Sequence, residues 1–117
     1  MLVSTTTLLI LLNSVRKHPL TVDSNLQGMA QDRCVNMLVF SHDDWYSTYS
    51  KVAESFGYYS VGENLALNFK DASSTFKALE ASPTHHRIEH SLEYQKEGIA
   101  NCNNSLGNVT VLEFSGN

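Results

Sequence analysis

The feature that most constrains the fold lies near the end of the chain, where two β-rich runs follow one another. "GIANC" and "VTVLEF", residues 98–102 and 109–114, are separated by the polar stretch "NNSLGN". Two such runs joined by a short polar segment predict a hairpin of antiparallel strands. The segments before it show helical spacing and no regular alternation of helix and strand. This order predicts an α+β fold.

Apolar residues at helical spacing indicate several helices ahead of the hairpin. Asp23 is placed to cap the second helix, Gly57 to end the third, and Ser82 to cap the last, with Pro83 at its first position. The stretch "SVGENLAL", residues 60–67, is typical of a short strand. The helices are expected over residues 7–17, 20–40, 43–59 and 73–81, with a short fifth helix starting at Pro83.

The same spacing predicts which side chains are buried. In the first helix they are Leu8, Leu11, Leu12 and Val15; in the second, Leu26, Met29, Ala30, Arg33, Cys34 and Met37; in the third, Trp45, Tyr49, Val52 and Phe56. The opening "MLVSTTTLLILLNSV" has a short apolar run, no basic first region and no small-residue cleavage site. It is also too short to span a membrane. It is therefore interpreted as the first helix of the domain, capped by a threonine, and no intact signal peptide is expected.

The 117 residues suit one domain, over residues 1–117. The net charge is −4, and the eight Lys and Arg residues are scattered without a basic patch, so nucleic-acid binding is not expected. The two cysteines, Cys34 and Cys102, fit a reducing compartment, one disulfide or two buried thiols. Two buried thiols are favoured, because Cys34 shares a helical face with Ala30 and Met37. A disulfide between the two cysteines is the alternative.

Three short motifs carry the candidate site residues. His42 follows the second helix in "FSHDD", where a turn or capping role is the simpler interpretation. Glu63 in "VGENLAL" is an acid in an apolar strand, so its carboxylate must be paired, hydrogen-bonded or bound to a cation. "SPTHH" places His85 and His86 in the first turn of the fifth helix.

A fourth pattern overlaps the last of these. His86, Glu89 and His90 spell H-x-x-E-H, the arrangement of an inverted zinc-protease motif on a helix. A polar, solvent-facing helix turn explains the same residues, and chance produces so short a pattern easily.

The motifs together resemble the CAP superfamily, whose SCP-like domain is shared by cysteine-rich secretory proteins, venom antigens and plant pathogenesis-related proteins. The likeness runs through "FSHDD", "GENLA", "SPTHH", "EYQKEGIA" and "VLEF", and is greatest to compact bacterial members. It implies a three-layer α-β-α sandwich around a small antiparallel sheet, and a cavity that gathers His42, Glu63 and His85. The family usually has arginine at the position of His86, and the second cavity glutamate of many eukaryotic members is replaced here by Ser82.

Two imidazoles and a carboxylate can hold a divalent cation, for which Zn²⁺ is expected. His42 and His85 would be ligands, and Glu63 would be a ligand or orient a water; Glu63 is also the candidate catalytic residue. Affinity for the metal should fall below about pH 6. A metal-free acid–base pair and a purely structural polar network are alternatives.

The resemblance further implies an extracellular, secreted or cell-surface module that binds a small-molecule, lipid or peptide ligand. A metal-dependent hydrolase is the alternative function, although no nucleophile is evident. Four tyrosines near the cavity segments would line a ligand groove or serve as packing: Tyr46, Tyr49, Tyr58 and Tyr59.

Overall fold

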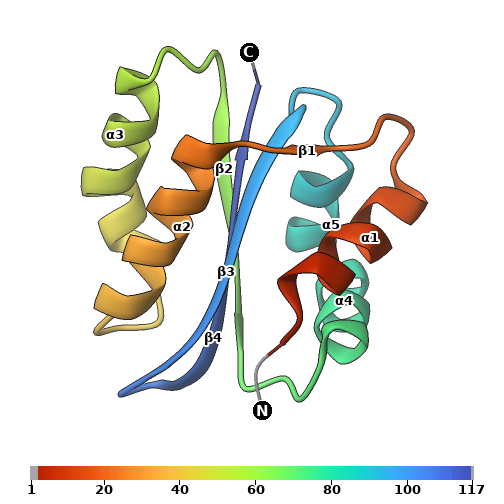
Figure 1. Ribbon diagram of the computed structural model, residues 1–117, viewed down its shortest axis with the longest axis vertical. Helices are drawn as coiled ribbons and strands as arrows, with labels where there is room; N and C mark the ends of the chain where they lie inside the picture. Colours follow the sequence, from red (N-terminus) through yellow and green to blue (C-terminus); the bar gives the residue numbers. More distant parts are fainter. Residues whose placement is uncertain (1–2, 117) are drawn as a thin grey trace.

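The computed structural model describes residues 3–116. In this range a four-stranded sheet lies between two layers of helices (Figure 1). One face is covered by α2 and α3, and the other by α1, α4 and α5. This is the predicted α+β fold, an α-β-α sandwich. The helices are α1 Thr5–Val15, α2 Ser24–Asn36, α3 Ser50–Ser55, α4 Ala72–Ala81 and α5 Pro83–His90, with the π-helix η1 Trp45–Tyr49 before α3.

The sheet has the strand order β1-β3-β4-β2. The predicted hairpin is confirmed and is longer than expected, because each of its strands extends beyond the β-rich run. A two-residue strand, β1, pairs parallel with β3 at the start of what was expected to be the second helix, so that helix begins at Ser24. β2 pairs antiparallel with β4 and is an edge strand. The strands are β1 Thr21–Val22, β2 Val61–Leu67, β3 Lys96–Asn104 and β4 Gly107–Ser115.

Local signals place most helix ends correctly. The Asp23 side chain accepts a hydrogen bond from the backbone N–H of Leu26, and Gly57 ends α3 with a φ of 86°. The cap of α1 is Ser4, not a threonine. Leu8 and Leu12 are fully buried under the sheet, whereas Val15 is exposed, contrary to the predicted stripe.

The third helix departs from its predicted face. Trp45 is buried as expected, but Val52 and Phe56 are exposed, and Ala53 is buried in their place. The reason is η1, because a π-helical turn inserts one extra residue and rotates all later side chains by one position. The face then continues from Tyr49 to Ala53.

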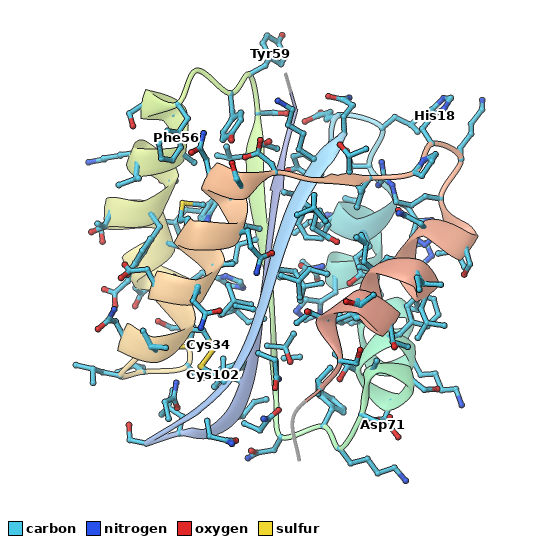
Figure 2. The ribbon with its side chains drawn as sticks, viewed as in Figure 1. His18, Cys34, Phe56, Tyr59, Asp71 and Cys102 are labelled. Carbon is cyan, nitrogen blue, oxygen red and sulfur yellow. A yellow bond between two sulfur atoms is a disulfide. The ribbon has the colours of Figure 1, made fainter. Side chains whose placement is uncertain are left out.

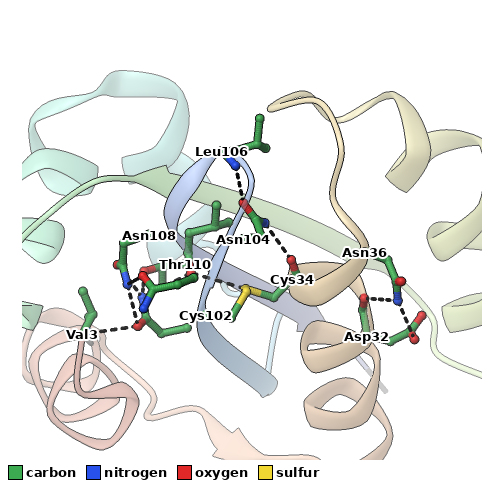
Figure 3. The surroundings of a disulfide bond; sticks show 12 residues. Val3, Asp32, Cys34, Asn36, Cys102, Asn104, Leu106, Asn108 and Thr110 are labelled. Carbon is green, nitrogen blue, oxygen red and sulfur yellow. Dashed lines mark hydrogen bonds between the residues drawn. A yellow bond between two sulfur atoms is a disulfide. The ribbon is translucent and has the colours of Figure 1, made fainter. Parts of the chain in front are cut away.

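The cysteines form a disulfide, so the preference for two free buried thiols was wrong (Figures 2 and 3). Cys34 near the end of α2 is bonded to Cys102 on β3, with a Cα–Cα distance of 6.2 Å. Asn104 Nδ2 donates a hydrogen bond to the Cys34 carbonyl at 3.0 Å and fastens the same helix end to the hairpin. The bridge therefore joins one helical layer to the sheet.

Candidate functional site

A cavity of about 630 Å³ lies beside the edge strand β2, between the η1–α3 segment and α5. Its volume is within the range of small-molecule sites. His42, Glu63 and His85 all line it, although they come from a loop, a strand and a helix. His86 and His90 do not line it.

Glu63 is 4% exposed and its carboxylate is fully engaged. Its Oε1 accepts from Arg33 Nε at 2.7 Å, and its Oε2 accepts from Arg33 Nη2 at 3.1 Å. Such a bidentate pair compensates the buried charge. Oε2 also lies 2.8 Å from His42 Nδ1. Glu63 thus joins the guanidinium to the imidazole.

His42 is oriented by this carboxylate. When Nδ1–H donates to Glu63, the lone pair of the ring lies on Nε2. A carboxylate that fixes the tautomer of a histidine in this way is the usual support of a metal-binding imidazole. Arg33 also holds the loop that carries His42, because its Nη2 donates to the Ser41 carbonyl at 2.7 Å.

His85 is fixed by a different partner. Its Nδ1 lies 2.9 Å from Ser82 Oγ. Ser82 is the N-cap residue of α5, as expected, but its side chain makes no cap hydrogen bond to the helix backbone. Burial, and then the nearby His42, lower the pKa of His85. Within residues 3–116, neither His42 nor His85 makes a hydrogen bond through Nε2. Each ring therefore offers a free nitrogen.

Asn64 sets the position of α5 against β2. Its Nδ2 donates to the His85 carbonyl at 3.1 Å and to Glu89 Oε2 at 3.2 Å. Neighbouring strand residues point to opposite faces, so Glu63 reaches toward α2 while Asn64 reaches toward α5. This alternation along one edge strand explains how two neighbouring residues can contact helices on opposite faces of the sheet.

A second acid lies behind Glu63 and was not predicted. Glu113 on β4 is the direct cross-strand partner of Glu63 and is fully buried, and Trp45 Nε1 donates to its Oε2 at 2.8 Å. Burial, followed by the neighbouring Glu63 carboxylate, raises the pKa of Glu113 well above its ordinary value of 4.5. The same signal that singled out Glu63, an acid within an apolar strand, was present in "VTVLEF".

Arg33 was expected to be buried, but its role was not predicted. It is 1% exposed on the inner face of α2, and its guanidinium lies 5.5 Å from the centre of the Tyr49 ring. A buried arginine requires an anionic or polar partner. The arginine within the apolar stripe of the second helix was therefore the available clue.

Three of the four tyrosines that were singled out line the cavity: Tyr46, Tyr58 and Tyr59. Tyr49 lies in a different hollow, between α2 and α3. The hydroxyl of Tyr58 hydrogen-bonds Asp23 Oδ2, and burial, with Asp23, raises its pKa to about 12. The opening beside β2 is therefore aromatic as well as polar.

Comparison with known proteins gives a clear structural likeness. No protein-family model and no curated protein matches the sequence significantly. Among solved structures, a cysteine-rich secretory protein of Staphylococcus aureus matches with a TM-score of 0.78 and 18% identity over 96% of this chain. An extracellular protein of Bacillus anthracis that contains an SCP domain matches with a TM-score of 0.81 and 18% identity, again over 96% of this chain.

These two proteins are larger, since the matched region covers 38% and 40% of their chains. An outer surface protein of Borrelia burgdorferi matches over 99% of this chain and 97% of its own, with a TM-score of 0.68 and 14% identity. Among residues 3–116, no helix has the length and apolar character needed to cross a membrane. The backbone likeness, together with the α-β-α layering, shows that this chain has the fold of the CAP superfamily.

Proposed function

We propose that residues 1–117 form an extracellular CAP module that binds a small-molecule, lipid or peptide ligand in the cavity beside β2, with Zn²⁺ at its polar end. The observation that carries the proposal is the pair of histidines lining this cavity. Each has its Nδ1 held by a protein partner and its Nε2 free.

His42 and His85 would be the protein ligands of the metal. Two imidazole nitrogens suit Zn²⁺, and the coordination positions they leave open are available to water or to a bound ligand, as in catalytic rather than structural zinc sites. A bound Zn²⁺ would supply a Lewis acid toward an oxygen of that ligand. The types of donor atom therefore support Zn²⁺, while the ligand atoms of His42, Glu63 and His85 do not all lie within 4.8 Å of one another among residues 3–116, so the side chains would have to move together around the ion.

Glu63 would orient His42 by accepting a hydrogen bond from Nδ1–H. Its two oxygens are engaged by Arg33 and His42, so its contribution is to hold the imidazole in the tautomer that presents Nε2. This arrangement favours the orienting role of Glu63 over direct coordination. It also favours a binding module over a hydrolase, because a fully paired carboxylate is a poor general base.

The extracellular location is supported by two observations. The Cys34–Cys102 disulfide is of the kind that persists in oxidising compartments. The structural neighbours are described as secretory, extracellular and outer-surface proteins.

The test is a Zn²⁺ titration by calorimetry of the wild type, His42→Ala and His85→Ala, with His18→Ala as the control. His18 is exposed in the loop after α1 (Figure 2) and is not among the residues that line the cavity. Both cavity variants should lose one equivalent of Zn²⁺, and the control should lose none. Unchanged zinc binding with lowered stability in both cavity variants would mean a structural polar network. Metal-dependent turnover on a panel of peptides and esters would mean that the domain is a hydrolase and not a binding module.

A further inference from the structure

A second group of metal-binding side chains lies between α4 and α5. The carboxylate of Glu80, near the end of α4, faces the rings of His86 and His90 on α5. The two histidines are four residues apart, so they project from the same face of the helix, one turn apart. Two helices packed side by side thus bring three candidate ligands together.

The geometry of this group is tight. His90 Nε2 lies 2.8 and 2.9 Å from the two carboxylate oxygens of Glu80, and His86 Nε2 lies 3.8 Å from Oε2. The two imidazole rings are stacked, with centroids 3.9 Å apart and an interplanar angle of 15°. Among residues 3–116 this is the only set of three His, Cys, Asp or Glu residues whose ligand atoms all lie within 4.8 Å of one another.

The distances suit a bound ion. Zn²⁺ binds histidine nitrogen and carboxylate oxygen at about 2.0–2.2 Å, so two ligand atoms of a tetrahedral site lie about 3.4 Å apart. The present nitrogen–oxygen distances of 2.8 and 3.8 Å lie on either side of that value. Small side-chain rotations would therefore complete the site, without a change in the helices.

The site is accessible and separate from the cavity. The side chains of Glu80, His90 and His86 are 18%, 28% and 50% exposed, so an ion can enter from solvent. The residues of α5 that line the cavity are Thr84, His85 and Ile88, which lie on another face of the helix.

The sequence pattern H-x-x-E-H contained two of these ligands but the wrong carboxylate. Glu89 is fully buried and accepts a hydrogen bond from Asn64 Nδ2, so it points into the protein, away from the histidine pair. The polar, solvent-facing interpretation of this turn is therefore wrong for Glu89. Glu80, six residues before His86, supplies the carboxylate from the neighbouring helix.

We propose that Glu80, His86 and His90 form a second Zn²⁺ site, on the outer surface of the α4–α5 pair. Two imidazole nitrogens and one carboxylate oxygen are a common zinc donor set with a free position for water. The same donors bind Cu²⁺ and Ni²⁺. An ion held there would link α4 to α5 across the turn that leads to His85.

The test measures Zn²⁺ stoichiometry and affinity by calorimetry on the full chain, with visible absorption of bound Co²⁺ as a second probe. His86→Ala is the primary variant, since His86 is the most exposed of the three ligands and its loss should disturb the fold least. We expect His86→Ala and His90→Ala to lose one equivalent of metal, or to bind it at least tenfold more weakly. Glu80→Gln should also weaken binding, and His18→Ala should match the wild type.

The cavity variants His42→Ala and His85→Ala should retain this site, so its failure and the failure of the cavity proposal are distinguishable. Circular dichroism and thermal unfolding without metal would identify any variant that does not fold. In folded variants, Zn²⁺ should raise the melting temperature of the wild type more than that of His86→Ala. Equal stoichiometry, affinity and thermal shift in the wild type and His86→Ala would overturn the proposal.

Discussion

At the scale of single residues, the candidate site depends on one buried ion pair. Arg33 and Glu63 are each about 1% exposed at the side chain and are bonded through two hydrogen bonds. Breaking a buried pair by removing one partner is far more costly than replacing both, because the remaining charge stays buried and uncompensated. His42 shares the carboxylate, so the pair also sets the orientation of the imidazole.

The Arg33→Met variant tests this dependence. It leaves the Glu63 carboxylate buried without its cation, and the free energy of unfolding should fall by about 3–5 kcal/mol, measured by urea denaturation. Lys51→Met, on the exposed face of α3, removes a cation of similar length and should change stability by less than about 0.5 kcal/mol.

A double variant completes the test. Arg33→Met combined with Glu63→Leu removes both charges and should recover much of the lost stability, because no buried charge is left unpaired. Equal losses in the single and double variants would contradict the view that Glu63 depends on Arg33.

At the scale of elements, α2 lies unusually close to β3. A Cβ added at Gly98 would overlap backbone atoms of Leu26 and Gln27, in the first turn of α2. The backbone cannot rotate away as a side chain can. Gly98 is therefore required by the close approach of helix and strand, and this approach places Arg33 and Cys34 against the sheet.

Two glycine substitutions, one on β3 and one on α2, should change the free energy of unfolding in opposite directions. Gly98→Ala should lower the free energy of unfolding by at least about 1–3 kcal/mol, because α2 must move away from β3. Gly28→Ala, on the exposed side of α2, meets no atom within 4 Å and should raise stability by about 0.5–1 kcal/mol. Thermal and urea unfolding of the two variants would measure both changes. A Gly98→Ala protein as stable as the wild type would disprove the close contact.

The elements also show where sequence patterns were sufficient. Asp23, Gly57 and Pro83 predicted helix ends well, because a cap or a left-handed residue acts within one turn of chain. The exposure of the Val52 and Phe56 side chains could not be predicted, because no clear sequence pattern indicates a π-helical turn. The two-residue strand β1 was missed for a similar reason, since the strand it pairs with, β3, lies more than seventy residues later.

At the scale of the whole molecule, the Cys34–Cys102 bridge closes a covalent loop with a sequence separation of 68. A cross-link over so many residues restricts the unfolded chain and, in the chain-entropy model, stabilises the fold by about 4 kcal/mol. The bridge connects the α2 layer to the hairpin, and its Cys34 end lies in the helix that precedes the loop carrying His42.

The disulfide prediction follows from this geometry. Cys34→Ala combined with Cys102→Ala should lower the free energy of unfolding by about 2–4 kcal/mol, measured by urea denaturation under non-reducing conditions. The wild type in the presence of a reductant should behave like the double variant. An unfolding midpoint unchanged by both treatments would show that the bridge adds no stability.

The sequence by itself determined the order of the elements, most of their ends, and the three motifs that carry His42, Glu63 and His85. These features depend on interactions within a few residues, such as caps, turns and apolar spacing. The order of the motifs along the chain was also enough to indicate the CAP fold.

Only the tertiary structure decided the partners of those residues. Arg33 for Glu63, Cys102 for Cys34 and Glu80 for the histidine pair all follow from how the elements pack. Each of these pairings joins two different elements of the fold. A spacing rule describes one helix or one strand, whereas the distance between side chains on different elements is set by the packing of the sheet and its two helical layers.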